Sequence, residues 1–251
     1  MGKTRLVVIG NGMVGHRFVE ELLGKASSDQ FEITIFCQEP RVAYDRVHLS
    51  SYFSDHTIEE LTLVKEGFYA KHGVNILIGE EAILVNRARK EVHSQTGRIV
   101  AYDKLVMATG SYPWTPPIKG SDGPDCFVYR TIEDLDAIEA CAKRSKKGAV
   151  VGGGLLGLEA AGAVKNLGME AHVVEFAPVL MAEQLDAMGG EQLRRKIEEM
   201  GVTVHTSKNT QEIIHHKQGK TKQFADGTSL DIDFIVFSTG IRPQEKLAKE
   251  C

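Results

Sequence analysis

The stretch Leu6-Val-Val-Ile-Gly-Asn-Gly-Met-Val-Gly15 decides the fold of this 251-residue chain. Its apolar run, residues 6–9, is typical of a buried strand and leads directly into a turn of the pattern Gly-x-Gly-x-x-Gly. Apolar residues then recur at helical spacing over 18–23, and the β-branched and aromatic run 33–37 suits a buried parallel strand. We therefore expect a strand, a glycine turn, a helix and a second strand in succession.

The same order of elements returns later in the chain. A strand over 149–151 leads into the turn Gly152-Gly-Gly-Leu-Leu-Gly157, which is followed by a helix and by a strand over 172–174. Each half also has a late apolar strand, and these two strands end in Thr109-Gly110 and Thr239-Gly240. This repeat predicts an α/β fold with two Rossmann-like, three-layer dinucleotide-binding domains.

The boundaries of the two domains follow from the repeat. We expect the first domain to cover residues 1–113, completed by about 231–251, and the second to cover 114–230. The segment 111–123 is rich in proline and glycine, which is typical of a crossing between domains. Further strands and helices are expected over 74–78, 82–85, near Val92 and Ile99, and over 104–107, 131–144, 190–200, 202–204 and 232–237.

The glycines of the two turns have distinct tasks in binding a pyrophosphate. The first, Gly10 or Gly152, permits the tight turn, and the second, Gly12 or Gly154, lets the backbone approach the phosphates. The third glycine of each turn allows the helix to pack against the strand. The helix then offers backbone N–H groups and a partial positive charge at its first residues. The remaining residues expected at these turns are Met13, Val14, Gly15 and Gly157.

An acidic residue follows the second strand of each unit. Glu39 lies 24 residues beyond Gly15 and Glu175 lies 18 beyond Gly157, close to the spacing of about 20 at which a carboxylate accepts hydrogen bonds from a ribose. Residues 176–178, Phe-Ala-Pro, supply no arginine that could offset repulsion between Glu175 and a 2′-phosphate. The sequence therefore favours NADH over NADPH.

Several segments resemble the pyridine-nucleotide–disulfide oxidoreductase superfamily in its single-flavin branch. Within that branch, Ile9-Gly-Asn-Gly-Met-Val-Gly-His16, Ala43-Tyr-Asp-Arg-Val-His-Leu-Ser-Ser51 and Val150-Val-Gly-Gly-Gly-Leu-Leu-Gly-Leu-Glu-Ala160 are similar to the NADH-dependent nitrite reductases. The resemblance runs across the whole chain and includes the segments 107–113 and 238–243. It implies that the first domain holds FAD, that the second holds NADH, and that a hydride passes from NADH to FAD.

The resemblance also assigns residues to the two cofactors. It implies Glu39 at the FAD ribose, Arg46 near the flavin or pyrophosphate, and the Ala82 backbone at the adenine. It places Glu159 near the nicotinamide and Glu175 at its ribose. The other implied cofactor-binding residues are Thr109, Gly110, Arg130 and Gly240. Hydride transfer needs no general acid or base, so no catalytic residue is assigned. His16, His48, His215 and His216 are interpreted as surface or local hydrogen-bonding residues.

Composition excludes several other function classes. The four cysteines, at positions 37, 126, 141 and 251, lack the short spacings of a zinc or iron–sulfur site, and no metal ligands are assigned. The net charge of −4 gives no reason to expect nucleic acid as a partner. No apolar run approaches the roughly 18 residues that span a bilayer, and the N-terminus lacks a signal peptide. A cytoplasmic protein is expected.

Two departures from the family pattern matter. Ser51 follows Leu49-Ser50 where related ferredoxin reductases often carry lysine, so no lysine beside the flavin can be assigned. Family members also continue past the segment 240–243 to a second FAD motif, and nitrite reductases continue to iron–sulfur and sirohaem regions. We therefore expect a fragment that passes electrons to metal centres outside this chain. A ferredoxin reductase, an NADH oxidase and a nucleotide-binding module without catalysis stay open as alternatives, as does a homodimer.

Overall fold

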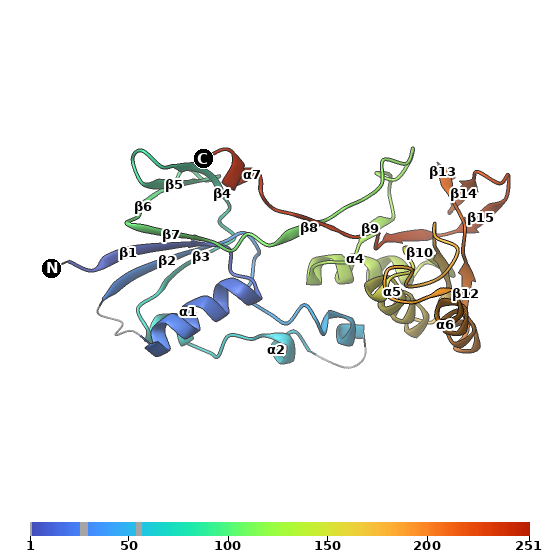
Figure 1. The fold of residues 1–251 in the computed structure, drawn as a ribbon, viewed down its shortest axis with the longest axis horizontal. Helices are drawn as coiled ribbons and strands as arrows, with labels where there is room; N and C mark the ends of the chain where they lie inside the picture. The colour runs from blue at the N-terminus through green and yellow to red at the C-terminus, as the bar shows by residue number, and fades with distance from the viewer. Residues whose placement is uncertain (1, 26–29, 54–56) are drawn as a thin grey trace. The chain divides into compact units, whose positions relative to one another are not determined.

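The computed structural model describes residues 2–25, 30–53 and 57–251, which form two compact units (Figure 1). Unit 1 contains the chain up to His48, Thr57–Tyr112 and Pro243–Cys251. Unit 2 contains residues 49–53 and Pro113–Arg242. Each unit is built on a parallel sheet, and each is described by itself below.

Unit 1 has a four-stranded parallel sheet in the order β3-β2-β1-β7. Leu6 and Val8 point from β1 toward a core shared with α1 and α3, whereas Val7 and Ile9 point to a core shared with β4 and β5. Because both faces of the sheet are covered, residues 6–9 of β1 are apolar without alternation. The elements are β1 (Thr4–Ile9), α1 (Met13–Lys25), β2 (Phe31–Cys37), α2 (Ile58–Leu61), α3 (Phe68–Lys71), β3 (Asn75–Ile78), β4 (Ala82–Asn86), β5 (Glu91–Ser94), β6 (Ile99–Ala101), β7 (Lys104–Met107) and α7 (Lys246–Lys249).

Unit 2 has a five-stranded parallel sheet in the order β12-β11-β10-β16-β9. Helices α4, α5 and α6 contact this sheet, and the antiparallel strands β13, β14 and β15 share a core with it. The elements are η1 (Leu49–Phe53), β9 (Cys126–Val128), α4 (Ile132–Ala142), β10 (Lys147–Val151), α5 (Leu155–Asn166), β11 (Glu170–Val174), α6 (Ala187–Glu199), β12 (Val202–His205), β13 (Thr210–His215), β14 (Lys220–Phe224), β15 (Ser229–Ile232) and β16 (Phe234–Phe237). The chain runs between the units through β8 (Ser111–Pro113) and β17 (Ile241–Pro243).

The predicted fold class, with two Rossmann-like units of three layers, is confirmed. A capping box is present at the start of α4. Thr131 Oγ1 accepts a hydrogen bond from the Asp134 amide at 3.2 Å, and the Asp134 carboxylate accepts one from the Thr131 amide at 2.8 Å. Helix α6 begins three residues earlier than expected, because Asp186 caps it by accepting a hydrogen bond from the Gly189 amide at 2.7 Å.

The unit boundaries differ from the expected domain bounds by one residue at Pro113, which lies in unit 2, and by longer stretches in two other places. Residues 231–242, assigned by sequence to the completion of the first domain, lie in unit 2 because β16 pairs with β10. Residues 49–53 also lie in unit 2. The antiparallel strands β13 to β15 were not predicted.

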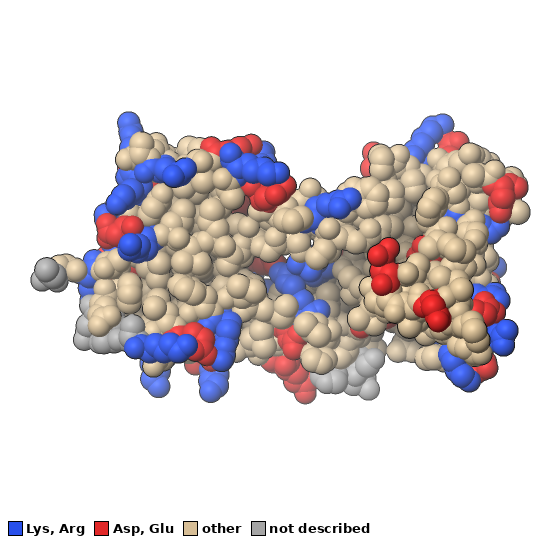
Figure 2. All heavy atoms as spheres, in the orientation of Figure 1, with Lys and Arg blue, Asp and Glu red and all other residues tan. Residues whose placement is uncertain are grey.

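The surface carries both signs of charge. On the face shown in Figure 2, basic and acidic side chains are interspersed among uncharged ones. Within the described ranges, no helix has the length and apolarity needed to cross a bilayer.

Candidate functional site

The first and third glycines of each turn are enclosed by backbone. A Cβ added to Gly10 would lie 2.2 Å from the carbonyl oxygen of Ala108, and one added to Gly15 would lie 2.0 Å from that of Gly10. The corresponding glycines of unit 2, Gly152 and Gly157, would meet backbone oxygens at the same 2.2 and 2.0 Å. No side chain fits these positions, so the protein itself requires glycine there.

The second glycine of each turn has a different environment. A Cβ added to Gly12 or Gly154 would meet no described atom within 4 Å. Gly154 has a φ of −82°, an ordinary value for any residue. Glycine is therefore not required by the packing of the described residues at either position. The omitted side chain instead leaves room for something that approaches the turn from outside.

The helices after the two turns present uncompensated N-termini. Neither α1 nor α5 has an acidic residue in its first turn, whereas α2 and α4 each have two. Met13 and Val14 open α1, and Val14 is 72% exposed. An N-terminus with exposed N–H groups and no carboxylate nearby is suited to binding an anion.

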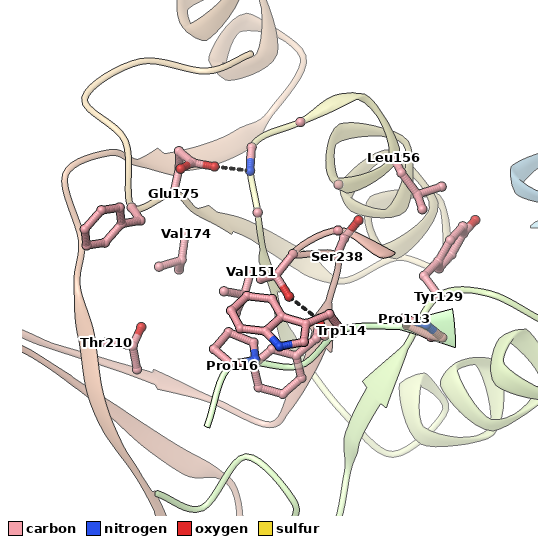
Figure 3. A pocket seen from close by; sticks show the side chains of 18 of the residues that line it. Pro113, Trp114, Pro116, Tyr129, Val151, Leu156, Val174, Glu175, Thr210 and Ser238 are labelled. Carbon is pink, nitrogen blue, oxygen red and sulfur yellow. Dashed lines mark hydrogen bonds between the residues drawn. The ribbon is translucent and has the colours of Figure 1, made fainter. Parts of the chain in front are cut away.

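A cavity of about 650 Å³ lies beside the turn of unit 2 (Figure 3). Its walls come from the carboxyl ends of β10, β11 and β16 and from the segment 113–118, which is where open α/β sheets bind their ligands. Most of its lining is apolar, and Glu175 and Lys208 are the charged residues among its described lining. The lining includes Trp114, Ile118, Tyr129, Val151, Gly152, Gly154, Gly157, Val174, Phe176, Phe237 and Gly240.

Glu175 is fixed directly to the glycine turn. One carboxylate oxygen accepts a hydrogen bond from the Ala177 amide at 2.6 Å, and the other accepts one from the Gly153 amide (Figure 3). A Cβ on Gly153 would lie 2.6 Å from Leu180 Cδ2 and 2.9 Å from a Glu175 carboxylate oxygen. Gly153, which the sequence did not single out, is therefore needed to bring Glu175 to the turn.

The acidic residue of unit 1 has different partners. Glu39 accepts a hydrogen bond from the Tyr44 hydroxyl at 2.9 Å and forms an ion pair with Arg46. The Arg46 guanidinium also lies over the Tyr44 ring, 4.8 Å from its centroid, and only 15% of the Arg46 side chain is exposed. The structure thus joins Glu39 and Arg46, which the sequence assigned to separate parts of FAD, in one cluster.

Asn11 links this cluster to the first glycine turn. Its buried side chain accepts a hydrogen bond from the Ala43 amide at 2.9 Å and donates one to the Tyr69 hydroxyl at 2.6 Å. His16 also contacts that hydroxyl, at 2.9 Å, so it has the local hydrogen-bonding role predicted for it. Burial raises the pKa of Tyr69 to about 12 and lowers that of His16. The network fixes the start of the segment 43–46 beside the turn.

A smaller cavity, of about 200 Å³, lies in unit 1. It is lined by Gly10, Ala82 and Thr109, three residues that the sequence assigned to FAD, and by Leu247 of α7. Glu39 and Arg46 are not among its described lining residues. The structure therefore brings Gly10, Ala82 and Thr109 together at this cavity, and Glu39 and Arg46 together in a separate cluster.

A Thr-Gly pair at the end of the late strand has the same contacts in both units. The threonine hydroxyl donates a hydrogen bond to the backbone carbonyl of a partner residue in another segment. The backbone amide of that partner residue donates a hydrogen bond to the glycine carbonyl. The distances are 2.8 and 2.9 Å in unit 1 and 2.5 and 3.0 Å in unit 2. The residues are Thr109 and Gly110 with Gln244, and Thr239 and Gly240 with Trp114.

Glu159 lies beyond the first turn of α5 and is held from η1. Ser50 Oγ donates to the Glu159 carboxylate at 3.1 Å and accepts from the Tyr129 hydroxyl at 3.1 Å. Burial raises the pKa of Tyr129 to about 12. Arg130 precedes α4, and its amide donates to the Asp134 carboxylate at 3.0 Å. It is not among the described residues that line the cavity of unit 2.

Comparisons with known proteins agree with this arrangement. The sequence matches the pyridine nucleotide-disulphide oxidoreductase family over residues 4–251. It is 72% identical to the nitrite reductase (NADH) large subunit of Escherichia coli strain K12, covering 100% of this chain and 30% of that subunit. It is 51% identical to the nitrite reductase [NAD(P)H] large subunit of Klebsiella oxytoca, covering 99% of this chain and 26% of the relative. The chain spans less than a third of the length of these relatives.

Solved structures share the fold. An NAD-dependent persulfide reductase from A. fulgidus matches with a TM-score of 0.90 and 29% identity, covering 98% of this chain and 47% of that one. A ferredoxin reductase from Rhodopseudomonas palustris matches with a TM-score of 0.91 at 22% identity, covering 98% of this chain and 61% of that one, and shows the fold alone. Sequence and fold together place this chain in the pyridine nucleotide-disulphide oxidoreductase family.

Proposed function

We propose that this chain is the nucleotide-binding part of an NADH-dependent nitrite reductase, with FAD in unit 1 and NADH in unit 2. When bound, these cofactors supply hydride transfer from NADH to FAD. The electrons then serve nitrite reduction to ammonia at iron–sulfur and sirohaem centres outside this chain. The 72% identity to the E. coli subunit supports the nitrite part of the proposal.

The observation that carries the proposal is the open second glycine of both turns. Gly12 and Gly154 both have free space where a Cβ would stand, so the packing of the described residues does not require glycine at either position. The backbone angle of Gly154 does not require glycine either. A pyrophosphate seated on the N-termini of α1 and α5 would fill that space and accept hydrogen bonds from their N–H groups. A bound dinucleotide would therefore explain why these two positions are glycine, which the packing of the protein alone does not explain.

The two acidic residues fit the riboses. Each oxygen of the Glu175 carboxylate already accepts one backbone N–H, and a carboxylate oxygen has a second lone pair that a ribose hydroxyl can use. In unit 1, Glu39 would bind the FAD ribose beside Arg46, and Ala82 would lie at the adenine. The mostly apolar walls of the cavity in unit 2 would exclude water from the nicotinamide. No residue is needed to move a proton in the hydride step.

An anaerobic titration tests the proposal. The purified chain is reconstituted with FAD, and its flavin absorption is followed while NADH is added. The bands should bleach in the unsubstituted chain, whereas Gly154→Ala should retain FAD but lose at least tenfold in NADH affinity (about 1.4 kcal/mol or more). Gly162→Ala, in the same helix and also with open space at its Cβ, is the matched control and should bleach normally.

Either of two results would contradict the proposal. If Gly154→Ala bleaches at the same NADH concentration as Gly162→Ala, the open glycine does not mark the pyrophosphate site. If the unsubstituted chain stays colourless with added FAD, unit 1 does not hold the flavin by itself.

A further inference from the structure

The cavity of unit 2 contains one basic side chain among its described lining residues, Lys208. The turn that carries Lys208 is bound to the segment after β11. The Lys208 amide donates to the Glu175 carbonyl at 2.9 Å, and the Ser207 amide donates to the Ala177 carbonyl at 2.9 Å. Lys208 is therefore a basic residue of the cavity lining whose backbone is bonded directly to Glu175, the proposed ribose site.

The ammonium group of Lys208 is directed to a partner beyond the cavity wall. Its Nζ donates to Asp226 Oδ2 at 2.6 Å and to Thr228 Oγ1 at 2.8 Å, and it lies 5.3 Å from the centroid of the Phe224 ring. Asp226 and Thr228 belong to the turn between β14 and β15. The hydrogen bond from Lys208 is the main reason why the pKa of Asp226 is lowered, so Asp226 stays ionised and keeps its hold on Lys208 near neutral pH.

We propose that Asp226 determines the nucleotide preference of unit 2 by holding Lys208. A 2′-phosphate beside Glu175 needs a cation to offset repulsion from the carboxylate, and Lys208 is the cation in reach. With the Lys208 ammonium paired to Asp226, the unphosphorylated ribose of NADH is preferred over that of NADPH. This inference rests on the proposed binding of a dinucleotide in this cavity, and it locates the preference in a residue that does not line the cavity.

The test uses the variant Asp226→Asn. Asparagine keeps the shape of the side chain but removes the charge that holds Lys208. It also places Asn before Gly227, whose φ is 80°, a combination that hairpin turns favour, so folding should be retained. Trp114 is the single tryptophan of the chain and lines the cavity, so its fluorescence reports binding without FAD or turnover. NADH and NADPH are each titrated into the unsubstituted chain and the variant.

We expect Asp226→Asn to tighten NADPH binding by about tenfold or more and to change the affinity for NADH by less than about twofold. The gain should vanish in the double variant Asp226→Asn/Lys208→Met. Asp231→Asn is the matched control, because Asp231 is an exposed acid of β15 that accepts a hydrogen bond from the Thr221 hydroxyl at 2.6 Å, and both affinities should stay unchanged.

The outcomes separate the two proposals. If NADH does not change Trp114 fluorescence, dinucleotide binding in this cavity is refuted. If NADH binds but Asp226→Asn leaves the NADPH-to-NADH ratio unchanged, or if the gain survives loss of Lys208, the role of Asp226 is refuted while dinucleotide binding stands.

Discussion

Lys222 offers a sharp test of the packing of unit 2. Its side chain lies fully inside the core on β14, between Ile213 of β13 and Leu230 of β15 in the strand register. Its Nζ has no hydrogen-bond partner among the described residues. Burial lowers the pKa of Lys222 from 10.5 to about 7. We predict that Lys222→Met, which keeps the length of the side chain and removes the charge, stabilises the protein.

The magnitude follows from the lowered pKa. A fall from 10.5 to about 7 corresponds, at about 1.4 kcal/mol per pKa unit, to up to about 5 kcal/mol against the charged form. Between these two values the unfolded chain binds the proton and the folded chain does not, so the free energy of unfolding rises with pH. Below pH 7 the full penalty applies. Lys222→Met should therefore have a free energy of unfolding several kcal/mol higher than the unsubstituted chain at neutral pH. Its free energy of unfolding should show little of the rise toward pH 10.

The assay is urea unfolding at several values between about pH 6 and about pH 10, followed by Trp114 fluorescence, which reports on unit 2. Lys220→Met is the matched control. Lys220 is equally buried on the same strand, but its Nζ donates to the Asp233 carbonyl at 2.8 Å and lies 3.6 Å from an Asp125 carboxylate oxygen. Its loss should destabilise by about 1–3 kcal/mol, because these acceptors lose their partner. A destabilised Lys222→Met, or a wild-type stability that is flat above pH 7, would refute the reasoning.

Two further predictions concern the sheet of unit 2. Gly157→Ala should lower the free energy of unfolding by about 3 kcal/mol or more, because its Cβ would lie 2.0 Å from the Gly152 carbonyl oxygen. Gly162→Ala should instead raise the free energy of unfolding by about 0.5–1 kcal/mol. Thermal unfolding followed by circular dichroism distinguishes the two variants. Burial lowers the pKa of His172 and of His205, which stack at 5.4 Å. The unfolded chain therefore takes up protons first as pH falls below about 6.5, and stability should decrease there. His172→Gln should weaken that dependence, and an unchanged pH profile would contradict it.

The parallel sheets could be predicted because their signals are local. The buried part of β1, residues 6–9, has both faces covered and is an uninterrupted apolar run, and the glycine turn fixes where it ends. The sheet β13-β14-β15 escaped prediction for a physical reason. The inward positions of β14 are residues 220, 222 and 224, and two of these are lysines. The alternation of apolar and polar residues that identifies a half-buried strand is therefore broken.

Some residues of the candidate site could likewise be predicted from local sequence signals, and others could not. The spacing from a glycine turn to the end of the next strand is set by one strand–helix–strand unit, so the position of Glu175 could be predicted from the sequence. Lys208 and Asp226 lie 33 and 51 residues further along the chain and reach the site only through tertiary contacts. No pattern in a single sequence marks such a pair. Asn11, a polar residue between two glycines, was also missed, although its context could have identified it.

The residue between the first two glycines makes the two units chemically different. In unit 1 it is Asn11, which holds the segment that begins at Ala43, and Arg46 of that segment neutralises Glu39. In unit 2 it is Gly153, whose small size admits the Glu175 carboxylate to the turn itself. Glu175 is bound there by two neutral backbone amides, and it lines the cavity. The repeated backbone therefore serves two sites of different charge, and the one at Glu175 is the site that should discriminate against a phosphorylated ribose.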